Sequence, residues 1–171
     1  VYTIVESPHE KGVIWSGSDD GLVYVTRDNG GSWTNATPRG APEGMINAIE
    51  VSPHDPATAY VVVSAYKMND IKPYIYKTTN YGDSWSRLDG DLPQDNFVRV
   101  VREDEEKQGL LYAGTESSLY ISFDDGENWQ SLKLNLPPVP ITDLTIRQGD
   151  LVVATQGRGF YVLDDIAVFS Q

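Results

Sequence analysis

Cysteine is absent from this chain of 171 residues. The absence excludes disulfide bonds and metal sites built from thiolates, such as most structural zinc sites. A bound metal would need oxygen ligands, and the spacing of an EF-hand calcium loop does not occur in the sequence. We therefore expect neither a metal centre nor a cofactor.

Basic residues are scarce. The chain has 13 Lys and Arg against 25 Asp and Glu, which gives a formal net charge of −12. Nucleic acids and anionic lipid surfaces both require basic protein surface, so we expect neither nucleic acid nor membrane as a partner. An acidic surface favours solubility and leaves peptides, neutral glycans and cations as candidate ligands.

Long apolar runs and an N-terminal targeting pattern are also missing. No stretch approaches the run of about 20 apolar residues that spans a bilayer. There is no initiator Met, and the chain opens on Val1-Tyr2-Thr3-Ile4-Val5, which has the composition of a β-strand. We expect the chain to be part of a longer protein, with any secretion signal outside it.

What the sequence does contain is an internal repeat. Three segments of eight residues share Ser or Thr at the first position, Asp or Asn at the third, Gly at the fifth and Trp at the eighth. We call residues 26–33, 78–85 and 122–129 the repeat windows. Their tryptophans are 52 and 44 residues apart (85 − 33 and 129 − 85). The matching residues are Thr26, Asp28, Gly30, Trp33, Thr78, Asn80, Gly82, Trp85, Ser122, Asp124, Gly126 and Trp129.

Each repeat window follows three short segments with the alternation and the β-branched residues of strands. A fourth copy near the end of the chain has these three segments and no window after them. Four antiparallel strands in about 45 residues are typical of one β-propeller blade. The sequence therefore predicts an all-β fold of about four propeller blades, of which the last is incomplete. The predicted blades are residues 1–38, 46–93, 97–136 and 141–171.

The residues of a repeat window fit a structural role. Glycine at the fifth position can take a positive φ at low cost. Asp or Asn at the third position can accept hydrogen bonds from backbone N–H groups further along the turn. The tryptophan is expected to pack between neighbouring sheets. Because Asn80 replaces the acid in one window, we interpret Asp28 and Asp124 as turn formers and not as catalytic acids.

The repeat windows resemble the Asp-box repeat, also called the BNR repeat, and the resemblance covers nearly the whole chain. Asp-box propellers include sialidases, xyloglucan-cleaving glycosidases, sortilin-like sorting receptors and photosystem assembly factors. Residues 151–165 resemble the last blade of large exported bacterial proteins described as BNR-repeat, glycosyl-hydrolase-like or sortilin-like. The resemblance implies an extracellular or periplasmic location, and it specifies architecture better than chemistry.

The turns of a four-stranded blade divide between two faces of a propeller. The turn from the second to the third strand shares its face with the links between blades, and function commonly lies on such loops. In the second unit this turn is expanded to residues 66–73. Tyrosine can stack on a sugar or peptide, and arginine can bind a carboxylate through two hydrogen bonds. The candidate ligand residues on this face are Asp19, Asp20, Tyr66, Lys67, Asp70, Lys72, Glu116 and Arg158. For Arg158, a solvated hairpin position is the alternative.

The opposite face carries both histidines of the chain. His9 and His54 lie in Ser-Pro-His turns at equivalent repeat positions, and we interpret them as turn-forming residues and not as ligands or bases. The acidic run 103–106 lies in the equivalent turn of the third unit and is predicted to be a solvated loop.

The function we expect is that of a binding or scaffold module, for a glycan or a peptide, within a larger exported protein. The first alternative is part of a glycoside hydrolase, sialidase-like or xyloglucanase-like, which requires two facing carboxylates. Asp19 or Asp70 together with Glu116 would supply the pair, or other blades would supply one acid. A resemblance to sialidases would imply an Arg-Ile-Pro or Arg-Leu-Pro motif, which this chain lacks. The second alternative is a sortilin-like peptide receptor, although the cysteine-rich segment of those receptors is absent here.

Four blades rarely close a ring in Asp-box propellers, and a fourth blade without its last strand leaves a sheet edge exposed. We therefore expect either further blades from the parent protein or the pairing of two chains into a ring of about eight blades.

Overall fold

The computed structural model describes residues 1–132 and 135–171, and its strands form consecutive antiparallel sheets. The first sheet contains β1 (Thr3–Glu6), β2 (Ile14–Gly17), β3 (Val23–Thr26) and β4 (Thr34–Asn35). The second sheet contains β5 (Met45–Val51), β6 (Ala59–Ser64), β7 (Ile75–Thr78) and β8 (Ser86–Arg87). The third sheet contains β9 (Val98–Glu103), β10 (Leu111–Thr115), β11 (Leu119–Ser122) and β12 (Gln130–Ser131). The fourth sheet contains β13 (Ile141–Arg147), β14 (Asp150–Thr155) and β15 (Gly159–Leu163).

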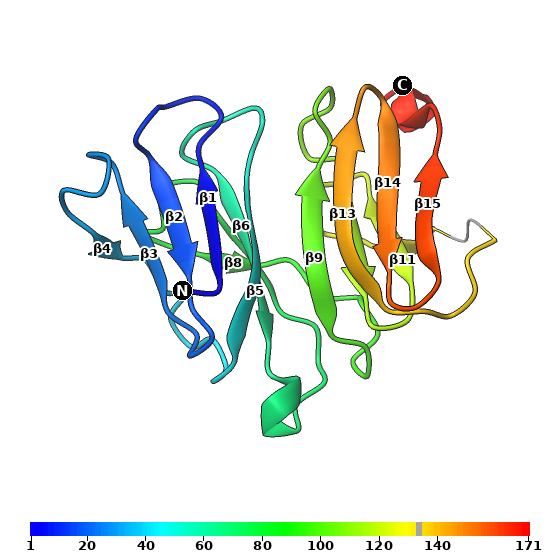
Figure 1. Ribbon diagram of the computed structural model, residues 1–171, viewed down its shortest axis with the longest axis horizontal. Helices are drawn as coiled ribbons and strands as arrows, with labels where there is room; N and C mark the ends of the chain where they lie inside the picture. The colour runs from blue at the N-terminus through cyan, green and yellow to red at the C-terminus, as the bar shows by residue number, and fades with distance from the viewer. Residues whose placement is uncertain (133–134) are drawn as a thin grey trace.

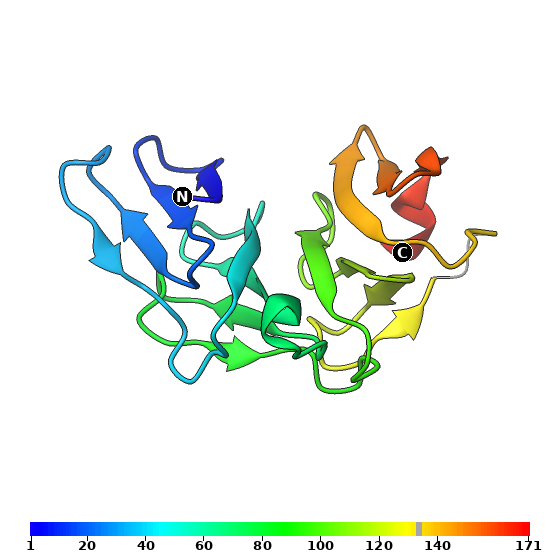
Figure 2. The same cartoon turned by 60° about the horizontal axis from the view of Figure 1, so that its bottom comes forward.

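The sheets follow one another around an open arc, with the first and fourth sheets at its two ends (Figures 1 and 2). In every sheet the strands lie in chain order, as in a meander. The innermost strands contact one another in sequence, β1 with β5, β5 with β9 and β9 with β13. The prediction of about four sheets, with an incomplete last one, is confirmed.

The hydrophobic core lies between the sheets and not within any one of them. One cluster joins the first and second sheets, and a second cluster joins the second, third and fourth. All six residues of β6 are buried, because the second sheet has a neighbour on each face. In contrast, Phe160 and Val162 of β15 are exposed, because no described sheet lies beyond the fourth. Burial therefore falls toward both ends of the arc.

The repeat windows form the turns between the third and fourth strands, and the three turns have the same hydrogen bonds. In the first window the hydroxyl of Thr26 donates to Asp28 Oδ1 at 2.7 Å and accepts from the N–H of Gly30 at 3.0 Å. Asp28 Oδ1 also accepts from the N–H of Ser32 at 2.8 Å. Matching bonds are present around Asn80 and Asp124. The three side chains are thus held inside their turns as acceptors.

The second and third windows join their sheets to the preceding ones. Trp85 Nε1 donates to the carbonyl of Ala36 at 2.8 Å, and Trp129 Nε1 donates to the carbonyl of Leu88 at 2.6 Å. The glycine of each of these two windows lies directly against the accepting residue. A Cβ added to Gly82 would lie 2.5 Å from the Cβ of Ala36. Glycine is therefore needed both for its φ of 88° and for this close approach.

Trp33, in the first window, differs from the other two tryptophans. It was expected to pack between sheets, but 42% of its surface is exposed, compared with 7% for Trp129. The physical reason is that no described sheet precedes the first one, so the indole of Trp33 has no neighbouring carbonyl to bind.

Both histidines make a second type of contact between sheets. His9 Nε2 lies 2.9 Å from the carbonyl of Ser52, and His54 Nε2 lies 2.7 Å from the carbonyl of Asp104. A carbonyl can only accept, so Nε2 carries the proton in each case. Each histidine therefore joins the turn after one inner strand to the equivalent turn of the next sheet.

One local expectation from the sequence is wrong. The run 103–106 is not simply a solvated loop, because Glu103 is only 2% exposed and Asp104 only 3%. Glu103 Oε1 accepts from the N–H of Gly109 at 2.9 Å, so this carboxylate stabilises the hairpin. Two short 3₁₀ turns, η1 (Tyr66–Met68) and η2 (Ile166–Phe169), follow β6 and β15.

The contact between sheets gives the first testable prediction. Gly82→Ala should destabilise the chain by about 2–4 kcal/mol, because strain at positive φ adds to a clash with Ala36. Gly40→Ala is the matched control, since Gly40 has a φ of 76° but no heavy atom within 4 Å of the added Cβ. Gly40→Ala should lower the free energy of unfolding only by the strain at positive φ, about 1–2 kcal/mol. Equal losses in urea denaturation would show that the close approach at Gly82 is not required.

Candidate functional site

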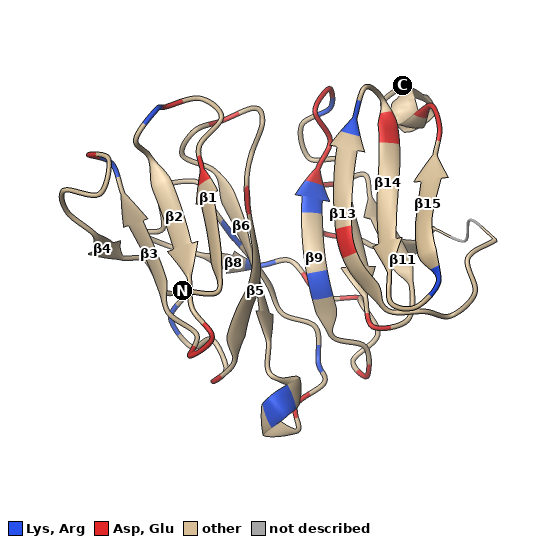
Figure 3. Ribbon diagram, in the orientation of Figure 1, with Lys and Arg blue, Asp and Glu red and all other residues tan. Residues whose placement is uncertain are grey.

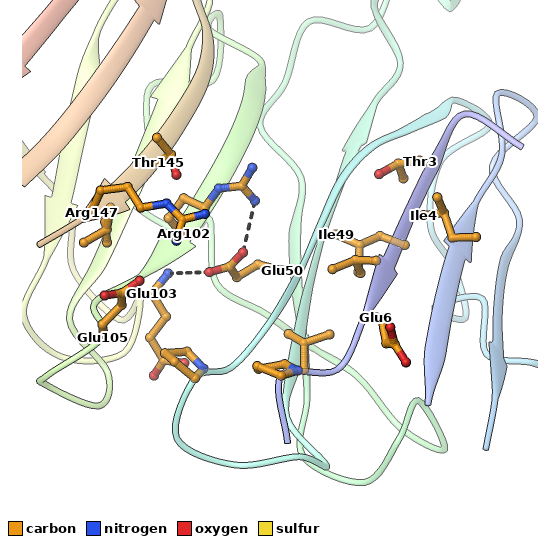
Figure 4. A pocket seen from close by; sticks show the side chains of 15 residues that line it. Thr3, Ile4, Glu6, Ile49, Glu50, Arg102, Glu103, Glu105, Thr145 and Arg147 are labelled. Carbon is orange, nitrogen blue, oxygen red and sulfur yellow. Dashed lines mark hydrogen bonds and ion pairs between the residues drawn. The ribbon is translucent and has the colours of Figure 1, made fainter. Parts of the chain in front are cut away.

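The concave side of the arc is hollowed by a cavity of about 430 Å³. All four inner strands line it, so no single repeat unit can form it alone (Figure 4). Apolar side chains such as Ile4 and Ile49 lie on one wall, and charged side chains, among them Arg102 and Arg147, lie on the other. Thr3 and Glu6 lie on the same side as Ile4 and Ile49, so the cavity combines a mixed wall with a charged one.

Arg102, on β9, is the centre of the charged wall. Its Nη1 lies 3.0 Å from Glu50 Oε2 on β5, and its Nη2 lies 3.0 Å from Asp143 Oδ1 on β13. Its Nε donates to the carbonyl of Leu144 at 2.7 Å. Figure 3 shows these basic and acidic positions on neighbouring strands. One guanidinium therefore bridges three sheets and fixes the positions of two carboxylates.

Glu50 has an altered acidity. Burial raises the pKa of its carboxyl from 4.5 to about 7, although the positive charge of Arg102 and a hydrogen bond from the N–H of Glu103 act in the opposite direction. The desolvation of a carboxylate outweighs one ion pair when the group is largely removed from water. Glu50 is consequently a group that changes its charge near neutral pH inside the cavity.

A second hollow, also of about 430 Å³, continues along the same concave surface. It shares Thr3, Ile49 and Arg102 with the first cavity, and it adds polar side chains that include Asn47 and Arg99. Asn47 Nδ2 donates to the carbonyl of Arg99, which joins β5 to β9. The concave surface is therefore one continuous polar groove with Arg102 at its middle.

Arg99, which lines this second hollow, also contacts a pair of aromatic rings, one of them from η1, which Figure 1 shows at the lower rim of the arc. The rings of Tyr66 and Phe97 are stacked, with centroids 5.1 Å apart and planes 12° apart. The guanidinium of Arg99 lies 5.2 Å from the centroid of Phe97, and its Nη2 lies 2.6 Å from Glu116 Oε2. We call Tyr66, Phe97, Arg99 and Glu116 the rim cluster. Tyr66 is 41% exposed, so part of its surface is accessible to a ligand.

The structure brings together only some of the ligand residues expected from the sequence. Tyr66 and Glu116 meet through the rim cluster. Asp70 instead accepts from the hydroxyl of Tyr74 at 2.6 Å, and this hydrogen bond is the main reason that its pKa is lowered. The remaining residues lie apart on exposed turns of the lower rim, namely Asp19 and Asp20 between β2 and β3, Lys67 and Lys72 near η1, and Arg158 between β14 and β15.

Sequence reasoning missed the residues of the groove itself. Glu50, Arg99, Arg102 and Asp143 lie within the first strand of three different units, where the sequence pattern predicts only packing. The available signal was the presence of charged residues inside these strands. A partly buried charge on an inner strand needs a partner, and for Arg102 the neighbouring inner strands supply it.

Three carboxylates in and beside the groove are paired with guanidinium groups. Glu50 and Asp143 are bound to the same guanidinium, and Glu116 is bound to Arg99. Glycosidases need two carboxylates on opposite sides of a scissile bond. Within residues 1–132 and 135–171, no group of three His, Asp or Glu side chains lies close enough to hold a metal ion.

Comparisons of sequence find two kinds of relative. The chain is 30% identical over 107 residues to the oligoxyloglucan-reducing end-specific xyloglucanase of Emericella nidulans, a match that covers 61% of this chain and 13% of that protein. It is 29% identical over 125 residues to the photosystem II assembly lipoprotein Ycf48 of a Synechococcus species, covering 72% of this chain and 35% of that protein. No protein-family model matches the chain.

Comparisons of structure find the same two kinds of protein, GH74 enzymes and Ycf48. An ancestral GH74 enzyme superposes with a TM-score of 0.76 at 15% identity, over 96% of this chain and 23% of the other. The GH74 xyloglucanase of Xanthomonas campestris superposes with a TM-score of 0.70 at 19% identity, over 96% and 29%. Ycf48 bound to D1 peptide superposes with a TM-score of 0.66 at 18% identity, over 95% and 54%.

These comparisons show a β-propeller fold. The chain is a propeller domain related to GH74 xyloglucanases and to Ycf48, and it matches 13% and 35% of the length of the two curated relatives named above. In the part of the chain that the structure describes, no helix has the length and apolar character needed to cross a membrane.

The pKa of Glu50 gives the second testable prediction. The folded value of about 7 exceeds the ordinary value of 4.5, so the folded chain binds more protons than the unfolded chain between these two pH values. The contribution of Glu50 to stability is therefore complete below pH 4.5 and is lost as the pH rises to about 7. The loss should reach about 2–3 kcal/mol.

Glu50→Gln should remove this part of the pH dependence, because the amide does not titrate. The measurement is the free energy of unfolding in urea between pH 4 and pH 8 for both chains. If the two curves kept the same slope across that interval, Glu50 would not have the raised pKa that its burial implies.

Proposed function

We propose that this chain is a non-catalytic binding module of the Asp-box, or BNR, propeller type within a larger exported protein, in an extracellular or periplasmic location. The observation that carries the proposal is the rim cluster, in which the partly exposed ring of Tyr66 stacks on Phe97, and Arg99 beside that ring lines the groove centred on Arg102. Aromatic faces, fixed guanidinium groups and a polar groove are the usual parts of a site for an extended ligand.

An extended peptide is the ligand that we favour. The groove offers side-chain donors and acceptors from strands of all four sheets. The ring of Tyr66, which stacks on Phe97 beside Arg99, offers a further apolar contact. A related propeller, Ycf48, has been solved bound to a D1 peptide, which supports peptide binding on this fold. The exposed candidates on the lower rim, Asp19, Asp20, Lys67 and Arg158, would contact the ends of such a ligand. A sortilin-like receptor would be one protein of this kind.

A glycan is the alternative ligand, and a role in glycoside hydrolysis is the second candidate function. Glu50 is the observation that favours it, because a carboxyl with a pKa of about 7 has the acidity of a general acid, and it lies in a cavity of about 430 Å³. The similarity to xyloglucanases points to the same chemistry. A partner carboxylate would then have to come from other blades.

The third testable prediction concerns Tyr66. Tyr66→Ala should weaken the binding of peptides selected on a random peptide array by about tenfold, because a stacking surface worth about 1 kcal/mol or more is removed. Met68→Ala is the matched control, since Met68 is exposed in the same 3₁₀ turn but is not part of the rim cluster. Dissociation constants from isothermal titration measure both variants. Equal weakening by the two changes would exclude the rim cluster as the binding site.

The fourth prediction separates the two functions. The chain incubated with xyloglucan should release no reducing ends, and xyloglucan oligosaccharides should bind more weakly than the selected peptides. Hydrolysis that is lost in Glu50→Gln while oligosaccharide binding is retained would instead establish the hydrolase function and contradict the binding proposal.

A further inference from the structure

The backbone N–H of a window tryptophan has a defined partner at the junction of the second and third sheets. The N–H of Trp129 lies 3.0 Å from Asp91 Oδ1 and 2.9 Å from Asp91 Oδ2. Asp91 stands three residues after Leu88, whose carbonyl accepts from the indole of the same tryptophan. The loop after β8 thus gives this tryptophan two acceptors, a carbonyl for the indole and a carboxylate for the backbone. The third window therefore shows that a carboxylate fits this place.

The junction of the first and second sheets has the same kind of window and a different loop. Thr37, in the loop after β4, is equivalent to Asp89, because each side chain accepts at 2.9 Å from the N–H of the first residue in the third strand of its sheet. Two residues further on, Arg39 stands where the loop after β8 has Asp91. A guanidinium has only donors, so Arg39 cannot accept from a backbone N–H. A cation thus replaces the carboxylate at this junction.

Arg39 and Trp85 line one cavity of about 470 Å³ at the junction of the first and second sheets. The indole of Trp85 binds the carbonyl of Ala36 as the indole of Trp129 binds its own acceptor, so the two backbone N–H groups are presented alike. Within residues 1–132 and 135–171, the N–H of Trp85 has no hydrogen-bond acceptor and Arg39 has no carboxylate partner. The cavity therefore has two donors that lack an acceptor, and one of them is positively charged.

The rest of the cavity lining is polar. Asn35, Thr37 and Ser84 contribute amide and hydroxyl groups, and Asn35 is held in place because its Oδ1 accepts from the N–H of Thr37 at 2.9 Å. Asp83 adds one exposed carboxylate, which can accept hydrogen bonds from hydroxyl groups but disfavours a ligand with several negative charges. The lining therefore suits a hydroxyl-rich ligand that carries a single negative charge.

We propose that this cavity is a second ligand site, which binds a hexuronic acid unit of an acidic glycan. The carboxylate of the sugar takes the place that Asp91 fills at the next junction, where it accepts from the N–H of Trp85 and from the guanidinium of Arg39. The hydroxyl groups of the sugar bind Ser84 and Asp83. The first strands of the sheets line the concave groove and not this cavity, so the inference does not depend on the ligand proposed for the groove.

The test is an NMR titration of the chain with methyl β-D-glucuronoside, in which the backbone N–H signal of Trp85 is followed. This signal should shift in a saturable way, and methyl β-D-glucoside, which lacks the carboxylate, should bind about tenfold more weakly or less. Arg39→Gln should weaken binding of the glucuronoside by about tenfold. Lys11→Gln is the matched control, because it removes the same charge from an exposed turn outside the cavity and should leave the affinity unchanged. Equal binding of the two sugars, or an unchanged affinity in Arg39→Gln, would overturn the proposal.

A second variant tests the comparison with Asp91 directly. Arg39→Asp places a carboxylate of the chain itself in the cavity, so the N–H of Trp85 should exchange with solvent about tenfold more slowly and the glucuronoside should no longer bind. Undiminished binding to Arg39→Asp would contradict the proposed position of the ligand carboxylate. N-acetylalanine, which has the carboxylate of a peptide terminus, is titrated in parallel. Tighter binding of N-acetylalanine than of the glucuronoside would overturn the assignment of the site to a sugar.

Discussion

At two of the three junctions between the described sheets, the indole of a tryptophan donates a hydrogen bond to a backbone carbonyl of the preceding sheet. The contact is made twice, by Trp85 to Ala36 and by Trp129 to Leu88. It requires a glycine at positive φ, because any side chain there would occupy the space of the preceding strand. The hydroxyl and carboxylate or amide of each window hold the turn that presents the indole. Sheets that bury both faces in this way need no helix to cover them.

The stacking of the sheets also creates the groove. Because the successive sheets follow one another around an open arc, their first strands, β1, β5, β9 and β13, lie side by side on the concave surface. Charges on these strands are close enough to pair across sheets, as Arg102 does with Glu50 and Asp143. The groove is therefore a product of the way in which the four described sheets assemble. The lower rim, with η1 and the rim cluster, lies at one end of this groove.

The sequence predicts the sheets much better than it predicts the groove. A turn of fixed geometry needs Gly and a hydroxyl residue at fixed spacing, so the repeat windows reveal the number and order of the strands. Arg102 and Glu50 lie in different units, and nothing near either in the sequence indicates the other. Tyr66 was found because its loop departs from the repeat, whereas its neighbour Phe97 was missed because it precedes an ordinary strand. The sequence also contains no sign of η2. The N–H of Ile166 donates to the carbonyl of Gly149, as the N–H of the fourth residue of each repeat window does to the equivalent carbonyl in the other sheets, but the glycine and tryptophan of the motif are missing there.

The most direct test of this account is the free energy of unfolding of Trp33→Phe, Trp85→Phe and Trp129→Phe, measured in urea. Phenylalanine keeps an aromatic ring but cannot donate the hydrogen bond. The account predicts that the changes at Trp85 and Trp129 each cost about 1 kcal/mol or more, and that the change at exposed Trp33 costs less than about 0.5 kcal/mol. Similar losses at all three positions would contradict it, because the tryptophans would then act within their own turns and not between sheets.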